Sequence, residues 1–463
     1  MKLIKDFNPL NILKRALQHG GDFADIYMEE TFNTSIICED NKIEKVVSGK
    51  DRGLGLRVIF DFKTAYAYTN DLTEKGLLEL ADTVSKAVKE GGSGKDIGLV
   101  KKEIAPGFSI KVPPQSVDLL EKVELVKKAN TFARGFDNRI GQVKVVYGDG
   151  FRQMVVVNSY GQWAEEDRIG ILFLVQVVAR EGDVVQTGYE PVGGVMGLEI
   201  FEETPPEKVA ELASKRALLM LKARKAEGGK MSVVLSNEAG GTMIHEAVGH
   251  GLEADLAQQG LSVYSGKIGE KIASPLVTVI DDATIPYRRG SFFFDDEGTH
   301  GQKTILVENG VLKNYMYDRL TALKDGAVST GNGRRESYHH RPIPRMTNTM
   351  IAPGKTNPED IIKSLGNGLF VKKMGGGQVN TVNGDFVFEI TEGYLIEKGK
   401  IGEPVRGATL TGNGPQILKN IDMVGSDLGF AIGTCGKDAQ GVPVSDAQPT
   451  LRIPEIVIGG EVK

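Results

Sequence analysis

Two similar series of short, β-branched segments restrict the fold of this chain more than any other feature. The first series occupies residues 25–68 and the second occupies residues 142–188. Runs of β-branched and aromatic residues separated by Asn and Gly turns are typical of antiparallel strands. The two series agree in segment order and loop length, which indicates a degenerate internal duplication. We expect strands at 25–30, 34–38, 42–48, 53–60, 64–68, 142–147, 153–158, 161–165, 169–180 and 184–188.

Helical segments flank these series. Their apolar residues recur at the spacing of one buried helix face, and Gly91 and Gly92 supply a stop signal after one of them. From a strand expected at 232–235 onward, strand patterns and Gly-rich turns dominate the sequence. The helices are expected within residues 1–20, 72–90, 116–135 and 206–226.

The chain is long enough for more than one hydrophobic core. It has 463 residues, whereas a domain usually has about 100–200. The change from mixed helix and strand to mostly strand falls near Gly228. We therefore predict an α+β protein with an N-terminal α+β meander domain over residues 1–227. A β-rich C-terminal domain over residues 228–463 is predicted to carry a metal site.

The composition argues against nucleic-acid binding and against a membrane span. The net charge is −5, so no overall positive field is available to hold a polyphosphate backbone. No apolar run approaches the roughly 18–20 residues that cross a bilayer. Asp6 and Asn8 interrupt the N-terminal apolar positions, which indicates an amphipathic helix and not a signal peptide. A cytoplasmic location is expected, in which Cys38 and Cys435 stay as thiols.

A His-Glu-Ala-Val-Gly-His segment after the strand at 232–235 carries the clearest chemical signal. Metallopeptidase helices usually place two histidine ligands four residues apart, with a Glu between them as general base. His245 and His250 are five residues apart, which on a regular helix turns one ring about 140° away from the other. The helix must therefore be altered, either by a π-turn or by ending at Gly249. Glu246 is then the candidate general base.

A catalytic zinc site takes three protein ligands, so two histidines are not sufficient. The third ligand must come from elsewhere in the chain, and spacing alone does not select it. The candidates are Glu253, His300, Asp295, Asp296, Glu297, His339, His340 and Cys435.

Two sets of carboxylates have a second interpretation. Glu253 follows His250 by three residues and either orients that ring or belongs to a solvated helix face. The run 295–297, together with Asp281 and Asp282, either forms a second metal cluster or marks turns, and turns are the commoner role.

Residues 375–379 form a Gly-rich segment without the lysine and the strand-to-helix context of a phosphate loop. Gly-rich turns are the default interpretation, and a bare strand edge that an extended peptide joins is the alternative. The candidates for stabilising an oxyanion are Tyr338, His339, His340 and Arg341, although such residues are usually exposed.

Six segments of the sequence together resemble one known family. They are NEAGGTMIHEAVGHGLEAD, RRGSFFFDDEGTHGQKTILVENGVL, RPIPRMTNTMIAPG, MGGGQVN, TEGYLIEKGKIGEPVRGATLTGN and GTCGKDAQGVPVSDAQPTLRI. They are similar to the TldD branch of the TldD/PmbA family of zinc-dependent peptidases. The resemblance covers essentially the whole chain and is strongest from about Ser236 onward. Ala439 and Ala447 stand where the family pattern has glycine.

This resemblance implies a zinc ion held by His245, His250 and Cys435, with Glu246 as the catalytic residue. Zinc would polarise the scissile carbonyl while Glu246 takes a proton from water and returns it to the leaving amine. The implied substrates are peptides or unfolded protein segments. The implied partner is a PmbA/TldE-like subunit that lacks the metal motif, or a second copy in a homodimer.

Two other classes of function are compatible with the same residues. Cys435 with a histidine base would make a metal-independent hydrolase, which should survive zinc chelation but not alkylation. A non-catalytic subunit of a peptidase assembly is the third class, and the intact Glu246 argues against it.

Overall fold

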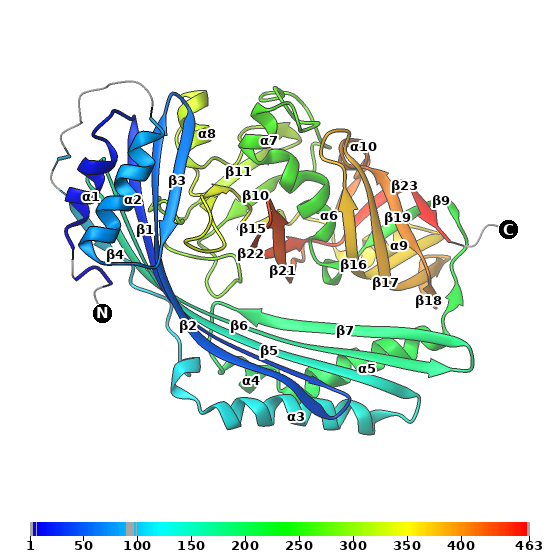
Figure 1. The fold of residues 1–463 in the computed structure, drawn as a ribbon. Helices are drawn as coiled ribbons and strands as arrows, with labels where there is room; N and C mark the ends of the chain where they lie inside the picture. Colours follow the sequence, from blue (N-terminus) through cyan, green and yellow to red (C-terminus); the bar gives the residue numbers. More distant parts are fainter. Residues whose placement is uncertain (1–2, 6, 89–96, 99, 461–463) are drawn as a thin grey trace.

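A computed structural model describes residues 3–5, 7–88, 97–98 and 100–460 of the chain. Its N-terminal half is built on one long, curved sheet (Figure 1). The strands of this sheet are β1 (Phe23–Glu39), β2 (Lys42–Phe60), β3 (Lys63–Thr69), β4 (Lys101–Ile104), β5 (Ile140–Asn158), β6 (Gln162–Glu181) and β7 (Val184–Gly194). Their order is β3-β2-β1-β5-β6-β4, and β7 also pairs with β6. Each predicted series forms one antiparallel meander, and the two meanders join where β1 pairs with β5.

The strands are fewer and longer than the sequence predicted. Asn33 and Gly49 do not end strands, because the two residues pair with each other across β1 and β2 and the ladder passes through them. A Cβ atom at Gly49 would meet no heavy atom within 4 Å, so this glycine is not required by packing. The expected segments at 25–30 and 34–38 merge in β1, those at 42–48 and 53–60 in β2, those at 142–147 and 153–158 in β5, and those at 161–165 and 169–180 in β6.

The predicted helices cover this sheet. They are α1 (Pro9–Ala16), α2 (Glu74–Lys86), α3 (Leu119–Phe136) and α5 (Pro206–Lys222), with the short elements α4 (Ile200–Glu203) and η1 (Pro114–Ser116). Helices α1 and α2 bury their apolar faces on β1 and β2, and α3 and α5 bury theirs on β5 and β6. The helix expected from residue 116 begins at Leu119, because the side chain of Asp118 caps α3 by accepting from the Leu120 N–H. Along the described residues, no helix is long and apolar enough to cross a membrane.

The C-terminal half is rich in strands, as predicted, which confirms the α+β class. One sheet contains β8 (Arg224–Lys225), β9 (Gly229–Leu235), β16 (Gly368–Val379), β17 (Asp385–Glu397), β18 (Lys400–Arg406), β19 (Thr409–Asn413), β20 (Met423–Val424) and β23 (Leu451–Gly459). The pairing of β16 with β17 closes the path β16-β9-β23-β19-β17 into a ring. Its interior belongs to the large core of this half.

A second sheet lies beside the ring and has the order β12-β11-β10-β15-β22-β21. Its strands are β10 (Val279–Asp282), β11 (Lys303–Glu308), β12 (Val311–Leu312), β15 (Asn348–Ile351), β21 (Gly429–Lys437) and β22 (Gln440–Gln448), and β13 (Gly333–Arg334) pairs separately with β14 (Ile343–Pro344). The helical elements are η2 (Asn237–Ala239), α6 (Thr242–Ile244), η3 (His245–Gly249), η4 (His250–Leu252), α7 (Ala254–Gln258), α8 (Arg319–Asp325), α9 (Pro358–Ser364) and α10 (Gly414–Asn420).

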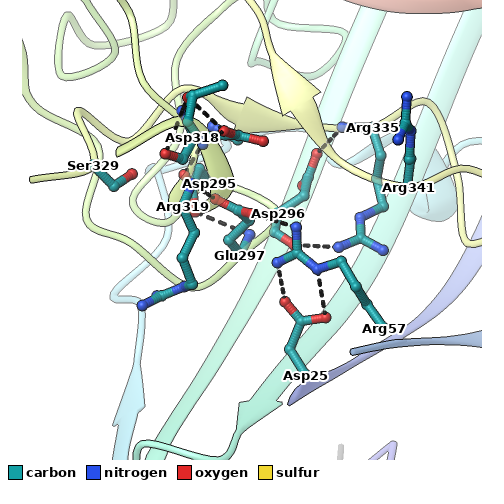
Figure 2. A network of polar contacts seen from close by, with 12 residues as sticks. Asp25, Arg57, Asp295, Asp296, Glu297, Asp318, Arg319, Ser329, Arg335 and Arg341 are labelled. Atoms are coloured by element: carbon teal, nitrogen blue, oxygen red, sulfur yellow. Dashed lines mark hydrogen bonds and ion pairs between the residues drawn. The ribbon is translucent and has the colours of Figure 1, made fainter. Parts of the chain in front are cut away.

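Buried ion pairs join the two halves (Figure 2). Arg57 of β2 pairs with Asp25 of β1 and, at 2.7 Å, with Glu297 of the C-terminal half. Asp296 accepts from Arg168 of β6 at 2.9 Å and from the Arg335 N–H at 2.8 Å. Leaving a buried charge without its partner costs folding free energy. These ion pairs therefore fix how the long sheet packs against the C-terminal half.

Candidate metal centre

The helix after β9 has the altered geometry that the histidine spacing requires. Residues 245–249 form a π-turn, and the His250 N–H donates to the His245 carbonyl, five residues back. This turn brings the two imidazoles together, with ring centroids 5.0 Å apart. Of the two alterations expected from the sequence, the structure shows the π-turn, and a 3-10 turn follows at His250.

The glycine in this turn has a packing reason. A Cβ atom at Gly249 would lie 2.0 Å from Sδ of Met346, which is fully buried. The π-turn therefore packs directly against the loop before β15. Any larger residue at position 249 would push the side chain of Met346 away from the turn.

Cys435 on β21 is the candidate third ligand that the fold brings to the histidines. Its Sγ lies 3.5 Å from Nε2 of His250. The ligand atoms of His245, His250 and Cys435 all lie within 4.8 Å of one another, the one such group of metal-binding side chains found in the described part of the chain. The convergence of three side chains from two distant segments supplies the donor set that zinc commonly takes.

Each histidine is oriented by a carboxylate on its other ring nitrogen. Nδ1 of His245 lies 2.7 Å from Asp446 on β22, and Nδ1 of His250 lies 3.0 Å from Glu253. Carboxylates in this position fix the ring and the tautomer of metal-binding histidines, and leave Nε2 for the metal. Of the two interpretations of Glu253, its buried contact with His250 fits the orienting one and not a solvated helix face. Asp446 was not among the predicted residues.

A sequence signal for Asp446 existed in the strand pattern. Cys435 pairs with Val442 in the β21–β22 hairpin, so Val442, Val444 and Asp446 alternate onto the Cys435 face. An acidic residue at the next position of a buried valine series is unusual unless it has a partner. The hairpin turns at Asp438 and Ala439, and Ala439 takes a positive φ of 56°, a region that favours glycine.

Lys437 and Arg345 hold the cysteine strand in place. Nζ of Lys437 lies 3.1 Å from Glu253 and 2.7 Å from Asp255, and Arg345 donates to the Cys435 carbonyl at 2.6 Å. Burial would raise the pKa of Glu253, but Lys437 and His250 outweigh it and lower that pKa to about 2. Glu253 is therefore a carboxylate at any ordinary pH.

The donor atoms have the protonation chemistry that a cation site needs. Burial alone would raise the pKa of the Cys435 thiol, but His245 and His250 lower it to about 5. Burial acts to lower the pKa of His250, whereas Glu253 and Cys435 raise it to about 10. The lowered pKa favours the thiolate form of Cys435, which is the form that coordinates a metal. Two imidazoles and one thiolate, each already oriented, fit a zinc ion.

Glu246 lies next to His245 in the chain and is left without a partner. Its side chain is partly buried, and among the residues that the structure describes it has no hydrogen-bond or ion-pair partner. Burial raises its pKa, an effect that the neighbouring His245 and His250 oppose. A free carboxylate with a raised pKa is suited to accept a proton.

The remaining candidates are engaged elsewhere. Nε2 of His300 pairs with Glu103 at 2.9 Å, His339 lies near Asp51, and His340 contacts Ser337. The hydroxyl of Tyr338 donates to Asp51, and the backbone of Arg341 accepts from Gln440. Among the described residues, the hydrogen bonds and ion pairs of these side chains do not include His245, His250 or Cys435. An oxyanion role for any of them stays a prediction.

The side chains of the acidic cluster have protein partners. Asp281 accepts from Asn332, Thr347 and Thr349, and residues 295–297 bind backbone N–H groups and arginines. Cys38 is buried in the N-terminal core, as expected for a small apolar side chain.

Family models match the chain in three consecutive parts. They are PmbA/TldA metallopeptidase domain 1 at residues 24–90, the central domain at residues 112–221 and the C-terminal domain at residues 228–460. The chain belongs to the PmbA/TldD family of metallopeptidases. The metal-centre residues all lie in the part that matches the C-terminal domain of this family. Our own division at residue 227 stays a prediction.

Relatives confirm the TldD branch. A metalloprotease TldD homolog from Buchnera aphidicola is 38% identical and covers 95% of this chain and 93% of its own length. A zinc metalloprotease TldD homolog from Saccharolobus solfataricus is 30% identical and covers 97% of this chain and 99% of its own.

Two solved structures share the fold of this chain. A putative modulator of a DNA gyrase from Thermotoga maritima has a TM-score of 0.79 at 23% identity, over 94% of this chain and 96% of its own. TldE from Thermococcus kodakarensis has a TM-score of 0.77 at 21% identity, over 98% of this chain and 100% of its own. At these identities the likeness concerns the fold alone.

Removing the charge of Asp446 is expected to weaken metal binding without unfolding the chain. In Asp446→Asn the ring of His245 loses its charged acceptor, and loss of such a partner typically costs about 10–100-fold in metal affinity. Competition with a chromogenic zinc chelator measures this change. Asp438→Asn, on the exposed turn of the same hairpin, is the matched control and should bind zinc like the parent chain. Equal affinity in both variants would contradict the orienting role of Asp446.

Proposed function

We propose that this PmbA/TldD-family chain is a zinc-dependent peptidase that cleaves peptides or unfolded protein segments. The observation that carries the proposal is the convergence of His245, His250 and Cys435 beside a carboxylate, Glu246, that has no other partner in the described structure. A relative named a zinc metalloprotease supports the choice of metal.

The roles of the residues follow from their contacts. His245, His250 and Cys435 would hold the zinc ion, with Asp446 and Glu253 keeping both Nε2 atoms directed at it. A bound zinc would supply Lewis-acid polarisation of the scissile carbonyl and lower the pKa of a water molecule. Glu246 accepts the proton of the attacking water and then delivers it to the leaving amine. Its partial burial assists both steps, because a raised pKa brings the acid and base forms closer in free energy.

A large cavity supports a peptide substrate: its lining includes chain neighbours of the candidate ligands, although the ligands and Glu246 are not themselves among its lining residues. It has a volume of about 1130 Å³ and lies between β7 and the C-terminal half. Thr242, one turn before Glu246, lines it, as do Ala431 and Ile432 of the cysteine strand β21. Gly375 and Gly376 of β16 also line this cavity, and no heavy atom lies within 4 Å of a Cβ built at Gly376. These glycines leave backbone accessible to an extended chain, which is the peptide-reading alternative expected from the sequence.

The assembly and the location belong to the same proposal. We propose that the chain works in the cytoplasm with a second subunit, either a TldE-like partner or another copy of itself. The TldE name of one structural neighbour and the acidic net charge of this chain support a peptidase assembly over a direct nucleic-acid role.

A metal-independent thiol hydrolase is the second candidate, favoured by the lowered pKa of Cys435. The burial of Cys435 argues against this candidate, because a side chain that is only 3% exposed offers a substrate little access to the sulfur. Its two histidines are also both held by carboxylates, whereas a Cys–His pair needs only one base.

Metal removal separates the two candidates. Dialysis against a zinc chelator is expected to reduce cleavage of an unstructured fluorogenic peptide by at least about 100-fold, the scale of losing a principal catalytic group. One equivalent of zinc should restore the rate. Full activity after chelation, combined with loss after alkylation of Cys435, would favour the thiol hydrolase.

A further inference from the structure

A second cavity lies between the long sheet and the C-terminal half and is lined by arginines from both. Its volume is about 390 Å³, within the range of about 300–1,000 Å³ that ligand sites usually have. The arginines in its lining are Arg152 and Arg168 of the sheet and Arg289, Arg334 and Arg335 of the C-terminal half.

The sheet wall of this cavity combines two guanidinium groups with bare backbone. Arg152 of β5 lies directly opposite Arg168 of β6, and Gly150 lies opposite Gly170. A Cβ atom at Gly170 would have its nearest neighbour, a backbone oxygen, 3.8 Å away. The wall therefore leaves room for a group that is not part of the chain.

The carboxylates around this cavity are already in ion pairs. Asp149, one of its lining residues, pairs with Lys122 at 2.6 Å. The two sheet arginines also have carboxylate partners, and these pairs are Arg152 with Glu29 at 3.2 Å, Arg168 with Glu166 at 3.1 Å and Arg168 with Asp296 at 2.9 Å. The guanidinium of Arg335 donates to the backbone carbonyl of Asp296 at 2.9 Å, beside the charge of that residue (Figure 2).

Arg289 and Arg334 have no carboxylate partner among the residues that the structure describes. Nε of Arg289 donates to the Gly433 carbonyl at 3.2 Å, and Arg334 donates to the Pro443 carbonyl at 2.7 Å. Burial lowers the pKa of both guanidinium groups, that of Arg334 to about 10. A buried charge without a counter-charge is costly, so this cavity holds two positive charges that a bound anion would compensate.

Hydrogen-bond donors in this cavity also remain free. The terminal nitrogens of Arg289 have no acceptor within the described part of the chain. Nε of Arg335, a residue only 1% exposed, is buried without a partner. The guanidinium carbons of Arg168 and Arg334 lie 5.0 and 5.4 Å from the centre of the Phe292 ring, which keeps these two groups close together. Several guanidinium groups converging on one space are suited to bind an oxyanion.

The charge balance selects the kind of anion. A phosphate monoester carries about −1.5 to −2 near pH 7, which matches two uncompensated guanidinium groups. A carboxylate carries a single charge and would leave one of them unbalanced. The planar fork of a guanidinium also fits two oxygens of one phosphate group.

We propose that this cavity binds a phosphate dianion, as inorganic phosphate or as a small phosphate monoester, through Arg289 and Arg334. Thr434 and Pro443, which line the cavity, pair with each other next to the pair of Cys435 and Val442. Side chains of successive strand residues lie on opposite faces, so the anion binds on the face of the β21–β22 hairpin opposite to Cys435. Because both arginines also bond carbonyls of this hairpin, the anion stabilises it. This inference does not depend on the peptidase activity.

Calorimetry with inorganic phosphate on the zinc-loaded chain tests the site. One phosphate should bind per chain. At about 100 times its dissociation constant, phosphate should raise the melting temperature by about 2–3 °C over sodium chloride of equal ionic strength. Sodium acetate should bind far more weakly, and glycerol 3-phosphate is the second probe. Tighter binding of glycerol 3-phosphate than of inorganic phosphate would assign the site to an organic monoester, and the reverse would assign it to the free ion.

Arg289→Gln removes one uncompensated charge and is expected to raise the dissociation constant of phosphate about tenfold or more, the scale of a charge-assisted hydrogen bond. Arg288→Gln is the matched control. Its guanidinium lies 3.8 Å from the Phe430 ring and is not in the lining of this cavity. Arg288→Gln should bind phosphate like the parent chain.

Gly170→Asp is a second variant that leaves every arginine in place. Its carboxylate would extend from the sheet wall and repel the anion, so phosphate should bind at least about tenfold more weakly. Gly49→Asp is the control, since a Cβ atom at this strand glycine of the same sheet meets no heavy atom within 4 Å. Circular dichroism melting of each variant separates lost binding from a lost fold.

Several results would overturn the proposal. They are a parent chain that does not bind phosphate, acetate binding as tight as phosphate binding, or unchanged affinity in Gly170→Asp and in a folded Arg289→Gln. Loss of phosphate binding in Cys435→Ala alone would place the anion on the metal and not in this cavity.

Discussion

Glu246→Gln is expected to reduce peptide cleavage by about 10²–10⁴-fold, the usual contribution of a positioned general base. The amide keeps the size of the side chain but cannot accept the proton of the attacking water. Because Glu246 bonds none of the predicted ligands, the variant should keep one zinc per chain. The measurement is kcat and KM on an unstructured peptide, with zinc content determined on the same sample.

The pattern of the loss distinguishes a proton-transfer role from a structural one. A fall in kcat with unchanged KM and unchanged melting temperature is the expected pattern. Glu270→Gln, an exposed glutamate in the same half of the chain, is the control and should have the parent rate. If Glu246→Gln retains normal turnover, the proposed mechanism is wrong.

Cys435→Ala is expected to remove the metal and, with it, all measurable hydrolysis. The thiolate is one of three donors, so its loss should cost more than the roughly 10–100-fold in affinity that follows the loss of an orienting carboxylate. Elemental analysis of the purified variant should show zinc far below one equivalent, and added zinc should restore neither content nor activity.

Cys38→Ala is the matched control for this change. It removes the other buried thiol of the chain, which lies in the N-terminal core away from the histidines. Cys38→Ala should keep both zinc and activity. A Cys435→Ala variant that binds zinc stoichiometrically would mean that a different residue completes the site.

The two strand series show which features of the fold could be predicted from the sequence and which could not. The meanders, the helices and the strand-rich C-terminal half followed from local periodicity, which acts within a few residues. The strand lengths did not follow, because Asn33 and Gly49 are local turn signals that each find a partner across the ladder. Pairing between distant segments overrides such local preferences.

Sequence spacing likewise predicted some features of the candidate site and left others open. The spacing of His245 and His250 required an altered helix, and the order of these residues with Glu246 indicated metal-assisted hydrolysis. Spacing left the third ligand open among eight residues, since nothing local relates Cys435 to a helix 185 residues earlier. Family resemblance named Cys435 as a ligand, and the fold brings its sulfur to the two rings.

Local sequence patterns were sufficient to predict the kinds of element, the acidic character of the chain and the altered turn that carries two imidazoles and a carboxylate. The packing of distant segments was needed to bring Cys435 and Asp446 of the β21–β22 hairpin to that turn, and to pair Asp296 and Glu297 with arginines of the long sheet. Periodicity and turn chemistry depend only on residues that are close together in the chain. Convergence at one point depends on the packing of sheets whose strands are far apart in the chain.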